Sequence, residues 1–347
     1  MKRKVTIRDV AKYAGVSVAT VSNVINNINK ASDETREMVL KSIKEIGYQP
    51  DFAARCLANG KSNLIGVMLP ITEKGDEPYL LLKDNPFFSE FISGIDFISC
   101  KRGYDFLIAG IESGQKCKEW IIKRNLDGII MLGMLPRSFF DEMEELKLPV
   151  VLIDAYEEFA TRFHRIMADD KNGGYISTKH LISLGHRYIA FVTGSIKYSG
   201  VNRERFEGYK KALQEAGIAL DPGLVFENHV TFEGGYQAGK KIMETNSKIT
   251  AVAAVADVVA FGLINVFRDH GKSVPDDYSV VGFDDIQLCQ YVVPRLTTIR
   301  QNIFKKGVAA VEAIISDIEL PSGTSETKIL SVELVRREST QKLDSSI

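Results

Sequence analysis

From about residue 63 onward, short apolar runs alternate with amphipathic segments of helical length. The apolar runs cover residues 64–69, 104–109, 128–132, 150–154, 188–193, 251–256 and 279–284. Runs of this length that are apolar on both faces are typical of parallel strands covered by helices on both sides. About 280 residues of this pattern exceed one sheet of usual size, so we expect an α/β body with two parallel-sheet subdomains.

The first 61 residues differ from this body in charge. They contain eleven Lys and Arg against six Asp and Glu, whereas the rest of the chain contains 33 against 39. A basic segment attached to an acidic body indicates a module that binds a polyanion.

The spacing within residues 6–46 predicts three short helices. Thr6 and Asp9 form a capping-box pattern, Gly15 ends the first helix, and Ser17 caps the second after a very short turn. The second helix carries a small, polar stripe without acids opposite its apolar face: Ala19, Ser22, Asn23 and Asn26. Such a surface suits a helix that enters the major groove of DNA. A plain three-helix bundle with a solvated face is the alternative, but the tight turn and the positive charge favour a DNA-binding domain.

Residues 50–61 form a linker with one possible short helix at 51–59, which Asp51 would cap. A helix of about two turns is marginal alone in water, so we expect it to fold only when it is docked.

Composition excludes several other classes of protein. The four cysteines (Cys56, Cys100, Cys117, Cys289) are scattered, which fits a reducing compartment and argues against disulfides, a metal site or a metal cofactor. No apolar region follows the charged N-terminus, so no secretory signal is expected. Residues 249–267 approach membrane-spanning length, but Asp257 at their centre favours a buried strand followed by a buried helix. We therefore expect a soluble, cytoplasmic protein.

An enzyme is the main rival class, because doubly wound α/β folds are often catalytic. The Gly-Lys-Ser triplets at 60–62 and 271–273 lack the glycine that a phosphate loop needs five positions before its Gly-Lys pair. The chain also has no GxSxG or HExxH motif, and its five histidines do not cluster in the sequence. Catalysis and an organic cofactor are not expected.

The segment TIRDVAKYAGVSVATVSNVIN at residues 6–26 resembles the opening of the lactose-repressor (LacI) family of bacterial transcription regulators. The resemblance continues, in order, through RERFEGYKKALQEAGI, VPDDYSVVGFDDI and LTTIRQN to LSVELVRRES near the end of the chain. It implies a helix-turn-helix domain at 1–49, a hinge at 50–61 and an effector-binding body at 62–340 with a periplasmic-binding-protein type I fold. The N-subdomain is expected at 62–165 and 295–324, and the C-subdomain at 166–294 and 325–340.

The resemblance also implies DNA contacts. Val18, Ala19 and Asn23 match positions that read bases. Thr20, Ser22, Asn26 and Tyr48 match positions that hold phosphates, and such contacts fix the register of the protein on DNA. The helix-capping residues Thr6 and Ser17 are also predicted to belong to the DNA-binding surface. In the hinge, Leu57 matches an apolar wedge in the minor groove and Arg55 lies near phosphates, although Asp51 and Phe52 depart from the family pattern.

In α/β sheets of this kind, ligands bind beyond the carboxyl ends of the strands. The resemblance assigns effector contacts to Phe87, Phe88, Asp154, Arg205 and Asp257. Three features depart from the family: Ala256 and Val230 replace an Asn and an aromatic residue, and residues 71–83 lengthen the stretch before Phe87 by about a dozen residues.

The sequence thus predicts a homodimeric repressor that binds double-stranded operator DNA. A sugar or sugar derivative that releases it from a pseudo-palindromic operator is the first expectation, and a purine-like co-repressor is the alternative. An α/β enzyme with a DNA-binding head is the most remote interpretation.

Overall fold

The computed structural model describes residues 5–25, 31–48, 61–69, 85–110, 113–133, 148–245, 248–321 and 323–343, and the single residues 82, 137, 139 and 141. The chain forms two compact units, Met1–Ser62 and Asn63–Ile347. Within the described residues, no helix combines the length and apolar character that crossing a bilayer needs.

The described residues of the first unit form three helices, as the sequence predicts. They are α1 (Ile7–Ala14), α2 (Val18–Ile25) and α3 (Asp33–Ile46). Val10, Val21 and Val39, one from each helix, are fully buried and form its core. Gly15 ends α1 in the left-handed conformation, with φ 66°, and its N–H donates to the Ala11 carbonyl. Glycine adopts this conformation without steric penalty, so the chain can turn into α2 within a few residues.

The second unit begins with a six-stranded sheet in the order β11-β5-β4-β3-β1-β2, in which every neighbouring pair is parallel. Its strands are β1 (Leu64–Leu69), β2 (Asp105–Gly110), β3 (Gly128–Leu132), β4 (Val150–Ile153), β5 (His164–Ala168) and β11 (Thr327–Leu330). Its helices are α6 (Pro86–Arg102), α7 (Gly114–Arg124) and α13 (Ile303–Glu319), with a short 3-10 helix at Glu158–Arg162. Ile65 and Val67 pack in the core with α6 and α13, whereas Leu64 and Met68 pack with α7.

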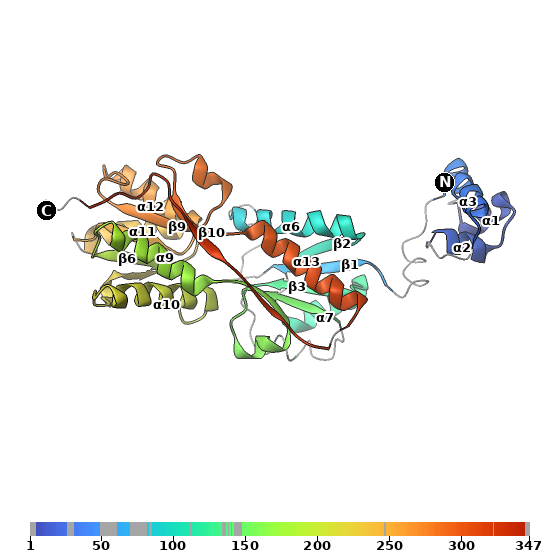
Figure 1. Cartoon of the computed structure of the whole chain (residues 1–347), viewed down its shortest axis with the longest axis horizontal. Helices are drawn as coiled ribbons and strands as arrows, with labels where there is room; N and C mark the ends of the chain where they lie inside the picture. Colours follow the sequence, from blue (N-terminus) through green and yellow to red (C-terminus); the bar gives the residue numbers. More distant parts are fainter. Residues whose placement is uncertain are drawn as a thin grey trace. The chain divides into compact units, whose positions relative to one another are not determined.

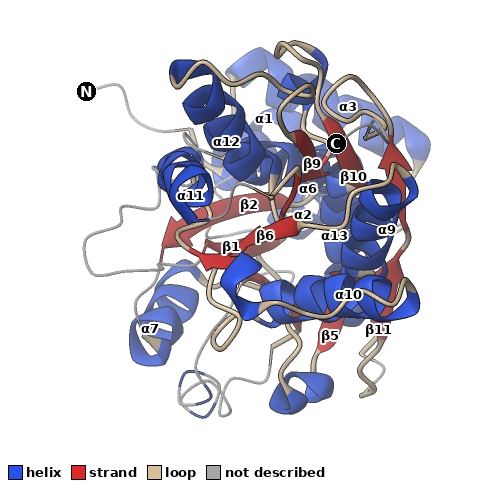
Figure 2. Cartoon of the chain, turned by 90° about the vertical axis from the view of Figure 1, so that its left-hand side faces the viewer, coloured by secondary structure: helices blue, strands red, loops and turns tan. Residues whose placement is uncertain are grey.

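A second six-stranded sheet has the order β12-β10-β9-β8-β6-β7, and only its β10–β12 pair is antiparallel. Its strands are β6 (Ile189–Thr193), β7 (Val225–Glu227), β8 (Ala251–Ala254), β9 (Ser279–Asp284), β10 (Thr297–Gln301) and β12 (Val332–Val335). Its helices are α9 (Asp170–Ser183), α10 (Gly200–Glu215), α11 (Phe232–Thr245) and α12 (Asp257–Asp269), with 3-10 turns at Pro222–Leu224 and Gln287–Gln290. Alternate residues of β6 enter different cores, Phe191 with α9 and α10, and Val192 with α11 and α12, so helices cover both faces (Figure 2).

The expected fold class is confirmed, and the chain crosses between the sheets a few residues beyond the approximate subdomain boundaries expected from the sequence. The chain passes between the two sheets near Asp169, Asn302 and Ser331 (Figure 1), later at each crossing than predicted. Strands β5 and β11 therefore complete the first sheet, and β10 lies in the second. The sequence pattern did not indicate these strands because they lack continuous apolar runs: β10 has the sequence TTIRQ, and β11 is largely exposed.

Candidate functional site

Helix α2 carries several of the residues that are predicted to contact DNA. Ser17 caps the helix by accepting a hydrogen bond from the Thr20 backbone N–H at 3.0 Å, and the hydroxyls of these two residues lie 2.9 Å apart. Val18, with 42% of its surface exposed, and Ala19 project from the first turn. The eight residues of α2 include no charged side chain. The first turn of α2 therefore presents small side chains and no acid that would repel phosphate.

The other predicted DNA-binding residues have varied surroundings. The Thr6 backbone N–H and hydroxyl both donate to the Asp9 carboxylate, at 2.8 and 2.7 Å, so Thr6 stabilises the start of α1. Ser22 and Asn23 are half-buried on α2, and Tyr48 packs against the head's core. Three of the predicted DNA-binding residues, Asn26, Arg55 and Leu57, lie outside the described part of the chain. The hinge segment 51–59 and most of the segment 71–83 also lie outside it.

In the body, a cluster of polar side chains lies where β4, β9 and β10 end. We call it the junction cluster, because it lies beside two of the crossings between the sheets. Its members are Asp154, Tyr156, Asp170, Arg205, Asp284, Gln301 and Lys306. The carboxyl ends of parallel strands are where ligands bind in folds of this type.

Lys306, on the first turns of α13, is a centre of this cluster. Its ammonium donates to both carboxylate oxygens of Asp154, at 2.9 and 2.8 Å, and to the side-chain oxygen of Gln301 at 2.6 Å. Only 1% of its side chain is exposed. The amide of Gln301 in turn donates to Asp284 at 2.6 Å. A continuous chain of hydrogen bonds thus runs from β4 in the first sheet to β9 in the second.

Arg205 forms the other charged pair of the cluster. Its guanidinium contacts Asp170 at 2.7 Å, donates to the Val255 carbonyl, and lies over the ring of Phe283. The Tyr156 hydroxyl donates to Asp170 at 2.5 Å, which links the segment after β4 to the start of α9. Arg205 is buried, and these contacts tie α10 to the start of α9 and to the end of β8. Its direct contact with a ligand stays a prediction.

Asp284 differs from the other carboxylates of the cluster, because no cation among the described residues forms an ion pair with it. Burial raises its pKa to about 6, against the lowering effects of Arg205 and the Gln301 hydrogen bond. Its backbone is in the positive-φ region, at 120°, which is unfavourable for any residue except glycine. Burial also raises the pKa of Asp154, although the Lys306 ammonium opposes this. Strained, desolvated polar residues are frequent at functional sites.

Asp257, which the family resemblance assigns to the effector site, is held by an internal hydrogen-bond network. This first residue of α12 has no exposed surface, and its carboxylate accepts hydrogen bonds from the Thr298 hydroxyl at 2.5 Å, the Ile286 backbone N–H at 3.0 Å and the Cys289 thiol at 3.0 Å. Burial, reinforced by the charge of Asp284, raises its pKa well above the usual range. Both oxygens accept hydrogen bonds from within the protein, so Asp257 fastens α12 to the segment after β9.

Phe87 and Phe88 begin α6, after β1. Both are half-buried, and their rings meet edge to face at 5.3 Å. The ring of Phe87 lies 5.6 Å from the Lys306 ammonium, which places Phe87 beside the junction cluster. Of the five predicted effector residues, Phe87, Asp154 and Arg205 are therefore brought together, while Asp257 lies deeper.

Sequence reasoning missed Asp284, Gln301, Lys306, Asp170 and Tyr156. Asp284 could have been found, because it ends the predicted strand 279–284 at the edge where ligands bind. Lys306 could not: it stands in an amphipathic helix, and its burial against Asp154, 152 positions earlier, exists only in the folded chain.

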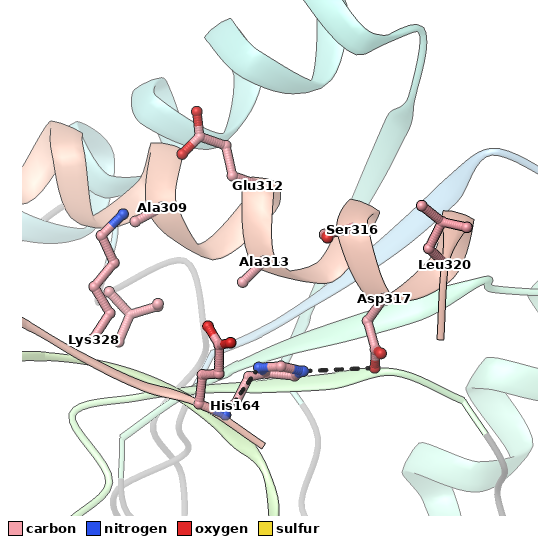
Figure 3. A pocket seen from close by; sticks show the side chains of 10 residues that line it. His164, Ala309, Glu312, Ala313, Ser316, Asp317, Leu320 and Lys328 are labelled. Atoms are coloured by element: carbon pink, nitrogen blue, oxygen red, sulfur yellow. Dashed lines mark hydrogen bonds and ion pairs between the residues drawn. The ribbon is translucent and has the colours of Figure 1, made fainter. Parts of the chain in front are cut away.

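A separate cavity of about 290 Å³ lies between α13, β5 and β11 (Figure 3). His164, the first residue of β5, faces Asp317 across 3.8 Å in this cavity, and Glu312, Glu326 and Lys328 also line it. It lies at the amino end of β5, and none of the predicted effector residues lines it, so we do not assign it as the ligand site.

Comparison with known proteins agrees with both parts of the chain. The model for bacterial regulatory proteins of the lacI family matches residues 6–51, and that for a periplasmic binding protein-like domain matches residues 178–340. The ribose operon repressor of Haemophilus influenzae is 34% identical over 97% of this chain and 99% of its own length. The repressor PurR of Histophilus somni is 33% identical over 97% and 99%. The solved lac repressor dimer bound to operator and the anti-inducer ONPF superposes with a TM-score of 0.84, at 27% identity, over 98% of this chain and 100% of that one.

A helix-turn-helix unit joined to a two-sheet body with a polar cluster at its strand ends defines a ligand-responsive, DNA-binding transcriptional regulator. The relatives match over almost the full length of the chain, so the match covers both units. The chain belongs to the LacI family of bacterial regulatory proteins, which confirms the resemblance.

Proposed function

We propose that this regulator is a repressor that binds a pseudo-palindromic operator as a homodimer and is released by a sugar-like ligand bound at the junction cluster. Two identical heads related by two-fold symmetry require two related half-sites in the DNA. The observation that carries the proposal is the junction cluster, because a desolvated carboxylate without its own cation lies where this fold binds ligands.

On DNA, the first turn of α2 would enter the major groove. Val18 and Ala19 would contact base edges, and Asn23 would read a base one turn further along. Thr20 and Ser22 would hold phosphates, and Leu57 of the hinge would wedge into the central minor groove. Each phosphate that the protein neutralises should contribute about −0.9 to the log–log slope of affinity against salt.

At the ligand site, Asp284 would accept hydrogen bonds from ligand hydroxyls, and the ring of Phe87 would pack against an apolar face of the ligand. Phe88 would support Phe87 from its edge. The buried pair of Arg205 and Asp170 would hold the start of α9 and α10 in place beside the ligand site.

The same cluster supports a route from ligand to DNA. Its hydrogen bonds connect β4 and Tyr156 on one side with β9 and α9 on the other, beside the crossings at Asp169 and Asn302. A ligand that favours one arrangement of the two sheets would shift their equilibrium and thereby the DNA-bound state. It can do so only by its difference in affinity for the two arrangements.

The DNA-binding half is tested with a duplex selected from a random pool and measured by fluorescence anisotropy. Ala19→Glu places an acid on an exposed position of α2, and we expect it to abolish binding while the fold persists. Met38→Glu makes the same charge change at an exposed position of α3 and serves as the control. Equal affinity of Ala19→Glu and wild type would refute the assignment of α2.

The ligand half is tested on the same duplex with a panel of sugars and nucleosides. We expect one sugar to release wild-type protein and to raise its melting temperature, because a ligand of the native state stabilises it. Asp284→Asn should lose this response, whereas Asp276→Asn, at an exposed position, should retain it. A normal response of Asp284→Asn would remove Asp284 from the site.

A purine-like co-repressor is the second candidate, because a PurR protein is among the relatives and an aromatic ring lies beside the cluster. The sign of the effect separates the two: a co-repressor strengthens DNA binding, and an inducer weakens it. The relatives are transcriptional regulators, which supports a cytoplasmic, non-enzymatic role.

A further inference from the structure

The charges of the junction cluster do not balance. It contains three carboxylates, on Asp154, Asp170 and Asp284, and two cations, on Arg205 and Lys306. Each cation already forms a close pair, Arg205 with Asp170 and Lys306 with Asp154. The excess charge at the strand ends is therefore negative.

Lys306 has no hydrogen-bond donor left for a ligand. An ammonium group has three N–H donors, and this one has three acceptor contacts within 2.9 Å, two on Asp154 and one on Gln301. With 1% of its side chain exposed, it is a fixed internal counter-ion. The same contacts occupy both oxygens of Asp154, so this carboxylate, although predicted as an effector contact, is neutralised from within the protein.

Within the part of the chain that the structure describes, Asp284 is the carboxylate of the cluster that has no cation in contact. Its carboxylate accepts a hydrogen bond from the neutral amide of Gln301, at 2.6 Å, and keeps acceptor capacity for other groups that donate hydrogen bonds. A ligand with a carboxylate or phosphate would instead bring like charge into a desolvated site, where Coulomb repulsion is strong.

We propose that Lys306 determines the charge class of ligand that this regulator accepts. By neutralising Asp154 from inside, it leaves a site for a ligand that is rich in hydrogen-bond donors and carries no acidic group. Removing the ammonium exposes a second carboxylate and converts the site into one that prefers a ligand with a basic nitrogen. This inference rests on the ligand site proposed above.

The first experiment compares matched sugars by thermal shift and by release of the selected duplex. The probes are ribose with ribose 5-phosphate, and glucose with glucosamine and glucuronate. For wild type, we expect the uncharged member or the amine to bind better than the acid of the same skeleton. In Lys306→Met, which keeps the length of the side chain, affinity for glucosamine relative to glucose should rise by about tenfold or more.

A second experiment needs no effector. Lys306→Ala leaves room for a small ammonium ion beside Asp154, so ethylammonium chloride should raise its melting temperature more than sodium chloride does. Wild type and Lys305→Ala, an exposed neighbour on the same helix, should show no such difference. The effect should vanish when Lys306→Ala is combined with Asp154→Asn. Should Lys306→Ala fail to fold, the glucosamine comparison in Lys306→Met decides.

The outcomes separate this inference from the proposed function. Tightest wild-type binding of glucuronate or ribose 5-phosphate would overturn the inference, as would an unchanged glucosamine preference in Lys306→Met. If no sugar binds wild type but ethylammonium stabilises Lys306→Ala through Asp154, the role of Lys306 stands and the sugar assignment falls.

Discussion

Replacement of Asp257 by alanine should destabilise the body, because the carboxylate is a structural acceptor. Its removal leaves the Ile286 N–H and the Thr298 hydroxyl, both hydrogen-bonded at 3.0 Å or less, without a partner, along with the weaker Cys289 thiol donor. An unsatisfied buried donor costs about 1–3 kcal/mol, which gives about 2–6 kcal/mol for the two stronger ones. Burying this carboxyl costs free energy in the native protein, as its raised pKa indicates, and the alanine variant is relieved of that cost. We therefore expect the free energy of unfolding to fall by about 2–3 kcal/mol.

The measurement is urea unfolding at pH 7, followed by circular dichroism. Asp257→Asn, which keeps one oxygen acceptor, should lose about half as much stability as Asp257→Ala. Glu244→Ala, an exposed acid on α11, is the control and should stay within about 0.5 kcal/mol of wild type. The reasoning is refuted if Asp257→Ala is as stable as the control and has lost only its response to ligand, since that result would return Asp257 to the ligand surface.

Burial lowers the pKa of His180 to about 4 and also lowers that of His186, so the unfolded chain binds protons there first. The free energy of unfolding should therefore fall as the pH drops from 6.5 to about 4, by up to ~1.4 kcal/mol per pH unit for His180. Urea unfolding at pH 7 and pH 5 measures this loss, which should be smaller in His180→Gln than in wild type. Because burial raises the pKa of Asp284 to about 6, effector affinity should be constant above that pH and fall by about tenfold per unit below it, as titration calorimetry would show; a flat profile in wild type would contradict this. Gly174→Ala should lower the melting temperature, because the added carbon would overlap the Arg205 carbonyl oxygen. Helix propensity alone would favour alanine by about 1 kcal/mol, so a melting temperature equal to or above that of wild type would show that α9 and α10 can separate.

Local patterns predicted the parts of this protein that depend on neighbours in the sequence. The caps at Thr6 and Ser17 and the left-handed turn at Gly15 placed the head's helices, because the groups that satisfy a helix end lie within a few residues of it. The continuous apolar runs of β1, β3 and β9 predicted parallel strands with their observed bounds. The polar or exposed strands β10 and β11 were not found, because their pairing comes from neighbours distant in the chain.

The candidate site shows the same division. That ligands bind at strand ends followed from the fold class, and it led to Asp154. The fold class did not indicate which carboxylate is free for a ligand, because Asp154 and Asp257 look alike in the sequence: each is an acid that directly follows an apolar run. Only tertiary structure brings Lys306 to one and Thr298 with Cys289 to the other, and leaves Asp284 with a neutral amide. Sequence alone determined a DNA-binding head on a two-sheet sensor; the charge that the sensor presents depends on long-range contacts, which no local pattern encodes.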